Sequence, residues 1–152
     1  MTVRQADKDD IPGLARLLWL NDREQEPDPQ GLEAFVSELA EWWAERGDDH
    51  IAFVADLDDG RDLAGMAWLA LGHRVPRPGR LDRIAGDIQS VYVLPDHRGH
   101  GLGSELVTAA VAEATRHGVL RVTVHSTTRA VPVYQRLGFA SAPELMQRMP
   151  DL

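Results

Sequence analysis

VYVLPDHRGHGLGSELV, residues 91–107, joins a strand-like run to an apolar helical pattern through a turn that holds three glycines. The glycines occupy positions 99, 101 and 103, where the strand passes into the helix. The backbone N–H groups of such a turn can converge on one anion, and the helix N-terminus adds partial positive charge. Glycines can equally serve the geometry of a tight strand–helix joint. The stretch by itself leaves both interpretations open.

Two common phosphate-binding motifs do not fit this turn. A P-loop needs Lys and then Ser or Thr after its last glycine, whereas Ser104 and Glu105 follow Gly103. A Rossmann fingerprint needs G-x-G-x-x-G and an acidic residue about 20 positions on, at the end of the next strand. The next predicted strand ends at His125 with no acid nearby. A metal-free nest of backbone N–H groups, suited to a pyrophosphate, fits better.

The segments before this turn predict a strand, two helices and a hairpin. Asp9 or Asp10 can cap the first helix, and Pro12 suits its first turn. Apolar residues at helical spacing define the second helix, and an Asp-Gly pair marks the hairpin turn. These elements are the strand 3–6, the helices 7–20 and 32–47, and the hairpin strands 51–57 and 63–71.

The segments around and after the turn predict alternating strands and helices. They are a strand over 87–94, a helix over 102–117, a strand over 119–125, a short helix over 130–137 and a terminal strand pair within 138–149. The order β-α-α-β-β-β-α-β-α-β places three strands in succession in mid-chain. It predicts the α/β class, as an α+β mixed sheet with helices on both faces, in a single domain covering residues 1–152.

The composition is that of a globular protein, with 43% hydrophobic and 26% charged residues. The chain has no cysteine, which excludes disulfides, thiolate metal sites and cysteine nucleophiles. No apolar run approaches the roughly 18–20 residues that cross a membrane, and the start MTVRQADKDD lacks a signal-peptide pattern. We therefore expect a cytoplasmic protein without a membrane partner.

The net charge of −8 argues against a nucleic-acid partner, because binding phosphates requires clustered cations. The charge is uneven along the chain. Residues 22–62 are rich in carboxylates and hold three arginines, whereas the loop 73–83 holds four arginines and two prolines. Each segment has two interpretations, a solvated charged surface or part of a binding site.

Three segments resemble the GNAT superfamily of N-acetyltransferases. Residues 91–103 resemble its acetyl-CoA signature, Arg/Gln-x-x-Gly-x-Gly/Ala after a V-x-P strand, and AVPVYQRLGF (130–139) resembles its second signature. VRQADKDDIPGLARL (3–17) looks like the opening of the family. The resemblance covers essentially the whole chain. It implies the GNAT acyl-CoA N-acyltransferase fold with splayed central strands.

The resemblance also implies where acetyl-CoA, the cosubstrate, binds, with no metal. The backbone of Val91, Tyr92 and Val93 would pair with the pantetheine arm, since the strand at 119–125 splays away. Thr127 stands where the family often has Asn, and its hydroxyl can still donate one hydrogen bond to the cofactor. The turn that would hold the pyrophosphate consists of Arg98, Gly99, His100, Gly101, Leu102, Gly103 and Ser104.

Two side chains match catalytic positions of the family. Tyr134 matches a tyrosine near the CoA sulfur that protonates the departing thiolate; the alternative is a structural tyrosine. Asp87 stands where members often carry a Glu that deprotonates the amine through water; the alternative is a solvated carboxylate. His125 is the other candidate base, because imidazole titrates near neutral pH. His97 and His100 are expected to contact phosphate or solvent.

The resemblance implies an N-acetyltransferase that moves an acetyl group from acetyl-CoA to a primary amine by direct attack in a ternary complex. In this fold the region between the first two helices and the arginine-rich loop typically wall the acceptor site, which here favours a small-molecule amine. The first region holds Trp19 and is acidic, with Asp22, Glu24, Glu26 and Asp28. A non-catalytic acyl-CoA-binding sensor of the same fold, and an acetyltransferase of protein N-termini or lysines, are the alternatives. A homodimer is one oligomeric form that the resemblance leaves open.

Overall fold

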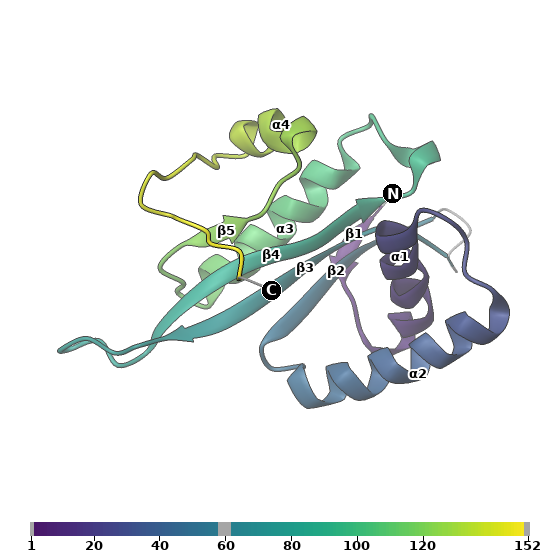
Figure 1. Cartoon of the computed structure of the whole chain (residues 1–152), viewed down its shortest axis with the longest axis horizontal. Coiled ribbons are helices and arrows are strands. Elements are labelled where there is room, and N and C mark those ends of the chain that lie inside the picture. The colour runs from purple at the N-terminus through teal and green to yellow at the C-terminus, as the bar shows by residue number, and fades with distance from the viewer. Residues whose placement is uncertain (1, 58–61, 151–152) are drawn as a thin grey trace.

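A computed structural model describes residues 2–57 and 62–150 as a twisted sheet between two layers of helices (Figure 1). The turn of the first predicted hairpin, residues 58–61, lies outside the described residues. The strands are β1 (Val3–Gln5), β2 (His50–Asp56), β3 (Leu63–Arg74), β4 (Arg83–Val93) and β5 (Val122–Val124). The α-helices are α1 (Ile11–Arg23), α2 (Pro29–Arg46), α3 (Leu102–Arg116) and α4 (Val131–Arg136). The short 3-10 helices are η1 (Lys8–Asp10), η2 (Pro95–His97) and η3 (Thr128–Ala130).

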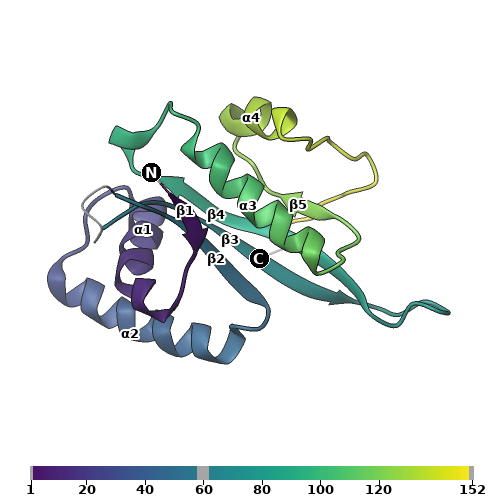
Figure 2. The ribbon, with the colours of Figure 1, turned by 180° about the vertical axis from the view of Figure 1, so that it is seen from behind.

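The strands lie in the sheet in the order in which they occur in the chain, β1-β2-β3-β4-β5. Neighbours from β1 to β4 are antiparallel, and β5 is parallel to β4. The helices α1 and α2 cover one face of the sheet and α3 covers the other (Figures 1 and 2). The predicted mixed sheet with helices on both faces is therefore confirmed. β5 can lie parallel to β4 because the connection between them passes through a helix.

Alternation along β2 divides the core between the two faces of the sheet. Ile51 and Phe53 belong to the cluster that includes Leu106 of α3, which is fully buried. Val54 points to the opposite face and belongs to the cluster that includes Leu14 of α1, which is also fully buried. β2 and most of β3 are buried on both faces, as expected for central strands. This core holds β4 in place from the β3 side.

The predicted strand pair within residues 138–149 is wrong. The chain instead makes a turn in which the N–H of Leu145 donates to the carbonyl of Ala142, 3.0 Å away. Pro143 favours this turn, because it lacks an N–H for a sheet ladder and its fixed φ suits a turn. Within the described residues, β5 therefore has β4 as its only strand neighbour.

The first helical turn is capped by Asp7, not by Asp9 or Asp10 as predicted. The Asp7 carboxylate accepts a hydrogen bond from the N–H of Asp9 (2.8 Å), and Oδ2 of Asp10 accepts one from the N–H of Asp7 (2.9 Å). Asp10 directly precedes α1, but its side chain accepts no capping bond from that helix. Its carboxylate instead faces the first strand.

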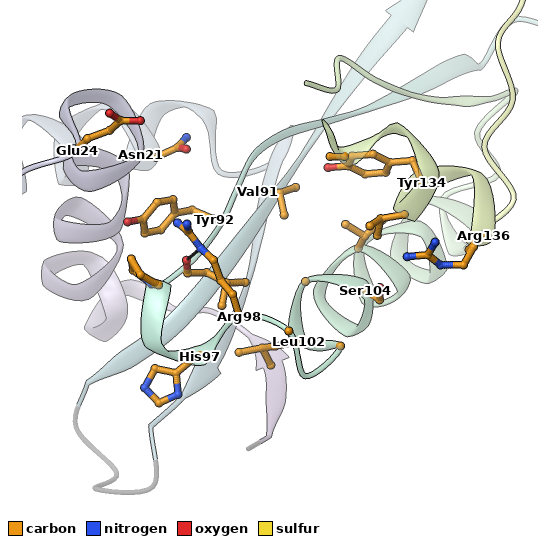
Figure 3. A pocket seen from close by; sticks show the side chains of 18 residues that line it. Asn21, Glu24, Val91, Tyr92, His97, Arg98, Leu102, Ser104, Tyr134 and Arg136 are labelled. Atoms are coloured by element: carbon orange, nitrogen blue, oxygen red, sulfur yellow. Dashed lines mark hydrogen bonds between the residues drawn. The ribbon is translucent and has the colours of Figure 1, made fainter. Parts of the chain in front are cut away.

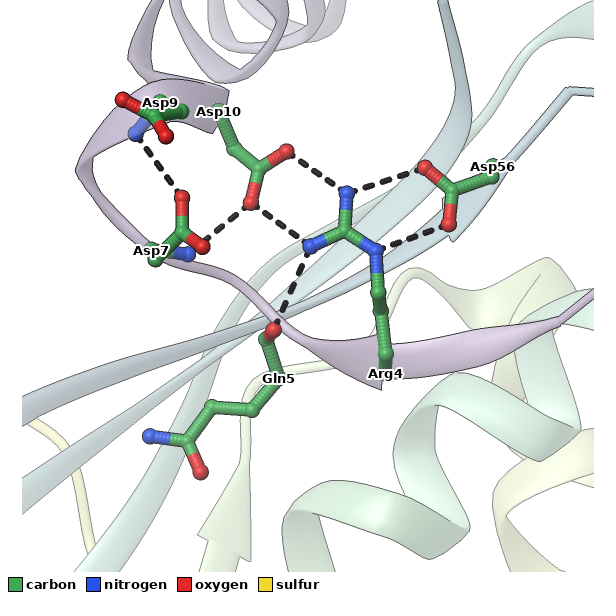
Figure 4. A network of polar contacts seen from close by, with 6 residues as sticks. All are labelled: Arg4, Gln5, Asp7, Asp9, Asp10 and Asp56. Atoms are coloured by element: carbon green, nitrogen blue, oxygen red, sulfur yellow. Dashed lines mark hydrogen bonds and ion pairs between the residues drawn. The ribbon is translucent and has the colours of Figure 1, made fainter. Parts of the chain in front are cut away.

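Arg4 connects β1 to β2 and to the start of α1 (Figure 4). Its guanidinium donates two hydrogen bonds to Asp10, at 2.7 and 2.8 Å, and two to Asp56, at 2.8 and 2.9 Å. Bidentate, charge-assisted pairs of this kind are among the stronger polar contacts in proteins. The hydrogen bonds with Asp10 raise the pKa of Arg4 and lower the pKa of Asp10. The network fixes the edge strand β1 against β2.

Two regions predicted as loops are more ordered than expected. β3 runs to Arg74 and β4 begins at Arg83, so the loop 73–83 is the tip of a hairpin. Figure 1 shows this tip projecting beyond the rest of the molecule. α1 continues to Arg23, and α2 already begins at Pro29. The longer α1 has a direct consequence for the site.

Candidate active site

β4 parts from β5 partway along its length, and this separation opens the site. Residues 86–88 of β4 pair with β5, but β4 continues to Val93, and no strand among the described residues lies next to it on that side. The expected splay of the central strands is therefore confirmed. The edge of β4 from Gln89 to Val93 offers backbone groups that no described strand pairs with.

A β-bulge bends β4 where it leaves β5. Met66 of β3 pairs with Tyr92 but Trp68 pairs with Gln89, so β4 holds one more residue than β3 in this interval. Ser90 lies there with a φ of 53°, a left-handed conformation that is uncommon for serine. An extra residue increases the local twist and redirects the strand. The side chain of Val91, directly after the bulge, lines the opening.

A cleft of about 830 Å³ occupies this opening (Figure 3). The volume lies within the range of roughly 300–1,000 Å³ that is typical of small-molecule sites. The walls come from the end of α1, the far half of β4, the glycine turn, the start of α3, and α4. The lining residues are Asn21, Glu24, Val91, Tyr92, Val93, Pro95, His97, Arg98, Gly99, Gly101, Leu102, Gly103, Ser104, Val107, Ala130, Val133, Tyr134 and Arg136.

The glycine turn needs glycine for its backbone conformation. Gly99 has a φ of 83° and Gly101 one of 80°, both in the left-handed region. A Cβ atom at either position would meet no atom within 4 Å, so space is not the constraint. No side chain caps α3, because its N-cap is Gly101. The first N–H groups of α3 are therefore available to an anion in the cleft.

Arg98 is anchored to the strand that precedes the turn. Its Nε donates a hydrogen bond to the carbonyl of Val93 (2.8 Å), and its guanidinium carbon lies 5.2 Å from the centre of the Tyr92 ring. Nδ1 of His100 lies 2.9 Å from the carbonyl oxygen of Arg98. Arg136 adds a second cation from the α4 wall (Figure 3). The cleft thus combines two guanidinium groups with the glycine turn.

Tyr134 enters the cleft from α4, on the wall opposite Val91 (Figure 3). Its ring is half-buried and packs edge-on against Phe139, with ring centres 5.5 Å apart. Burial raises the pKa of the Tyr134 hydroxyl, because the phenolate would lose solvation. The hydroxyl therefore stays protonated at neutral pH and can donate a proton into the cleft.

Three of the predicted site residues do not line the cleft. Asp87 accepts hydrogen bonds from Oγ1 of Thr123 (2.7 Å) and Nε2 of Gln89 (2.9 Å). Thr127 caps η3, where its hydroxyl accepts a bond from the N–H of Ala130 (3.3 Å). His100 borders a neighbouring hollow. The alternative base, His125, is exposed and is also absent from the cleft wall.

The end of α1 supplies two residues that line the cleft; Glu24 belongs to the acidic region expected to wall the acceptor site, whereas Asn21 was not expected there. Asn21 and Glu24 line the cleft, although the sequence placed both in a loop. Asn21 also borders an adjoining hollow of about 390 Å³ between α1, α2 and the bulge. That hollow is lined by Leu18, Trp19, Asn21, Asp22, Arg23, Phe35 and Ser90. These side chains reach the bulge because α1 extends to Arg23, further than the sequence predicted.

The arginine-rich hairpin does not contribute to this cleft. None of its arginines is among the lining residues, and Figure 1 shows its tip at the end of β4 away from the glycine turn. The described residues also contain no cluster of three or more His, Asp or Glu side chains suited to a metal ion. No helix in the described part of the chain is long and apolar enough to cross a membrane.

Comparison with known proteins gives consistent results. A glucosamine 6-phosphate N-acetyltransferase of Trypanosoma brucei brucei is 31% identical over 56% of this chain and 56% of its own length. A mycothiol acetyltransferase of Pseudarthrobacter chlorophenolicus is 30% identical over 85% of this chain and 40% of its own length. The chain thus spans about half the length of these relatives.

The fold has close counterparts among solved structures. A crystal structure described as a predicted acetyltransferase with acetyl-CoA, from Clostridium acetobutylicum, superposes with a TM-score of 0.73 at 21% identity. The superposition covers 97% of this chain and 95% of that one. The sequence model of the Acetyltransferase (GNAT) family matches residues 12–139. The chain therefore belongs to the GNAT family of acetyltransferases.

Proposed function

We propose that this protein transfers the acetyl group of acetyl-CoA to the primary amine of a small molecule, by direct attack in a ternary complex. The observation that carries the proposal is the composition of the cleft. A free strand edge, a glycine turn that leads into the uncapped N-terminus of α3, and a tyrosine whose pKa is raised by burial line one opening of about 830 Å³. These are the parts that binding a long, flexible thioester and releasing its thiol require.

Successive parts of acetyl-CoA would bind at successive parts of the cleft. The amides of the pantetheine arm would pair with the free edge of β4 at Val91 and Val93, like a short extra strand. The pyrophosphate would lie at the glycine turn, against the uncapped N-terminus of α3, with Arg98 and Arg136 near it. The Thr127 hydroxyl accepts a hydrogen bond from the N–H of Ala130 and keeps its own hydrogen, which it could donate to the cofactor.

The transfer makes one bond and breaks one. The neutral amine nitrogen attacks the thioester carbonyl carbon, the N–C bond forms, and the C–S bond then breaks. The N–H of Val91 would stabilise the oxyanion of the tetrahedral intermediate. The thiolate would take its proton from Tyr134, whose hydroxyl is protonated at neutral pH because burial raises its pKa. The amine would lose its proton to Asp87 or His125 through water.

The acceptor amine would enter from the α1 side of the cleft. Asp22 and Glu24 stand at this entrance, and their charge would attract a cationic amine. The adjoining hollow of about 390 Å³ has room for a small molecule rather than for a protein segment. Two relatives carry the names of small-molecule acetyltransferases, for glucosamine 6-phosphate and for mycothiol, which supports this substrate class.

Thiol release from acetyl-CoA across a panel of amines tests the proposal. The panel contains amino sugars and their phosphates, amino acids, polyamines, lysine peptides and peptides with free N-termini. We expect release with at least one small-molecule amine. Release with the peptides alone would indicate a protein acetyltransferase. Binding of acetyl-CoA in calorimetry without release for any amine would indicate a non-catalytic sensor.

A further inference from the structure

The tip of the β3–β4 hairpin forms a projection, which we call the arginine arm (residues 74–83). Arg77 and Arg80 exchange two backbone hydrogen bonds, at 3.0 and 2.8 Å. Between them, Pro78 and Gly79 make the turn, and Gly79 has a φ of 76°. Figures 1 and 2 show the arm extending beyond the sheet and away from both layers of helices. Backbone hydrogen bonds within the tip therefore define its turn.

The arm places like charges directly opposite each other. Arg74 pairs across the hairpin with Arg83, and Arg77 with Arg80. Like charges at opposed positions weaken a strand pair. Across residues 2–57 and 62–150, no carboxylate lies within ion-pair distance of the four guanidinium groups. A local conflict of this kind is expected where a partner from outside resolves it.

Arg83 shows the same imbalance at the base of the arm. It is buried, and its Nη1 donates to the carbonyl of Val75 (2.6 Å), but its Nε has no hydrogen-bond partner. Burial and the neighbouring arginines lower its pKa. The arm thus holds four arginines and one carboxylate, Asp82, which lies within ion-pair distance of none of them.

The arm also exposes large apolar side chains. Val75 is 81% exposed and Leu81 is 76% exposed, and they lie between the two arginine pairs. A charged hairpin that exposes two large apolar groups is suited to a surface that is both anionic and apolar. A small anion would match the arginines but would leave the apolar groups in water.

The exposed side of α2 has this complementary character. Glu38, Glu41, Trp42 and Glu45 follow one another at spacings that place them on one stripe of the helix, the α2 stripe. All four are exposed, and Trp42 is 36% exposed. The guanidinium carbon of Arg46 lies 5.4 Å from the centre of the Trp42 ring, so this ring already accepts an arginine.

We propose that the protein forms a symmetric dimer in which the arginine arm of each protomer docks on the α2 stripe of the other. A two-fold axis makes the contact twice, because each protomer both donates an arm and receives one. The arginines would pair with the glutamates, and Val75 and Leu81 would cover Trp42. Neither surface lines the cleft, so the dimer stands independently of the proposed function.

Charge-swapped variants test the dimer by sedimentation analysis over a wide concentration range. We expect the wild type to dimerise, more weakly as salt is added. Arg77→Glu/Arg80→Glu and Glu38→Arg/Glu41→Arg should each raise the dissociation constant by about 100-fold or more. An equimolar mixture of the two variants should restore the dimer, because each variant then meets a partner of opposite charge at both contacts.

The control Lys8→Glu/Arg129→Glu changes the net charge as the arm variant does, but on other exposed surfaces. It should dimerise like the wild type, and circular dichroism should show that all variants are folded. A monomeric wild type, a dimer insensitive to the swaps, or a mixture that stays monomeric would overturn the proposal. Binding of duplex DNA by a monomeric wild type, lost in the arm variant, would overturn it by identifying nucleic acid as the partner.

Discussion

Arginines lie beyond both ends of β4, but the contacts of their side chains differ. At the end near the glycine turn, Arg98 is held by the carbonyl of Val93 and by the ring of Tyr92. At the other end, Arg77 and Arg80 face each other with no anionic partner among the described residues. The first arrangement positions a strand–turn joint, and the second leaves charge for a contact outside the chain. The contacts in three dimensions, not the number of arginines, distinguish the arginine of the cleft from those of the arm.

The largest contrast between these ends should appear in turnover. Tyr134→Phe removes the proposed acid but keeps the packing against Phe139, so we expect kcat to fall by about 100-fold or more while stability is kept. Arg77→Gln, at the arm end, should leave kcat unchanged. Steady-state rates of thiol release by the two variants measure this difference in kcat. Equal kcat values for Tyr134→Phe and the wild type would remove the acid role.

The pH dependence of kcat sharpens the same prediction. Burial raises the pKa of Tyr134, so its acid form persists across neutral pH and is lost only above about pH 10. A fall in wild-type kcat between neutral and mildly alkaline pH that disappears in Tyr134→Phe would contradict this assignment.

A smaller effect should separate two glycines within the turn. Gly101→Ala forces a left-handed φ on alanine and should lower the free energy of unfolding by about 1–2 kcal/mol. Gly103→Ala is the matched control, because Gly103 lies in α3 and a Cβ there meets only Val93 Cγ2 at 3.8 Å. It should raise the free energy of unfolding by about 0.5–1 kcal/mol. Urea unfolding measures both, and equal losses would show that the turn does not depend on its φ angles.

The smallest effect should separate the two arginines of the cleft. Arg98→Lys keeps the charge but loses the Nε bond to Val93, which should cost about 0.5–1.5 kcal/mol of stability and raise the KM for acetyl-CoA. Arg136→Lys is the control, because the side chain of Arg136 makes no hydrogen bond within the described residues, and stability should change by less than about 0.5 kcal/mol. Urea unfolding and the KM for acetyl-CoA, measured for both variants, test this prediction. Unchanged stability and an unchanged KM in Arg98→Lys would show that only the charge of Arg98 matters.

Much of the fold could be predicted from local signals. The alternation of β2, the glycines of the turn and the helical spacing of α3 each lie within the segment whose conformation they predict. The positions of Val91 and Tyr134 followed from matched family motifs, and the structure brings both to one cleft. Their roles in binding and catalysis stay predictions.

The features that could not be predicted depend on contacts between distant segments. Nothing local marks Ser90 as a bulge residue, because serine seldom adopts a positive φ. The last turn of α1 contains Leu20, which the core buries, and this burial carries Asn21 to the cleft. The strand pair at 138–149 was wrong because weak alternation there does not outweigh the turn at Pro143.

The order of the strands has a consequence for synthesis. Each of the first four strands pairs with a strand adjacent in sequence, so most of the sheet can assemble while the chain is still emerging from the ribosome. β1 can pair only after β2 has been synthesised, because the ion-pair partner of Arg4, Asp56, lies in β2. The cleft is completed only after α4 has been synthesised, since Tyr134 and Arg136 follow all five strands in the chain. A nascent chain that stops after α3 would therefore hold most of a sheet but no complete site.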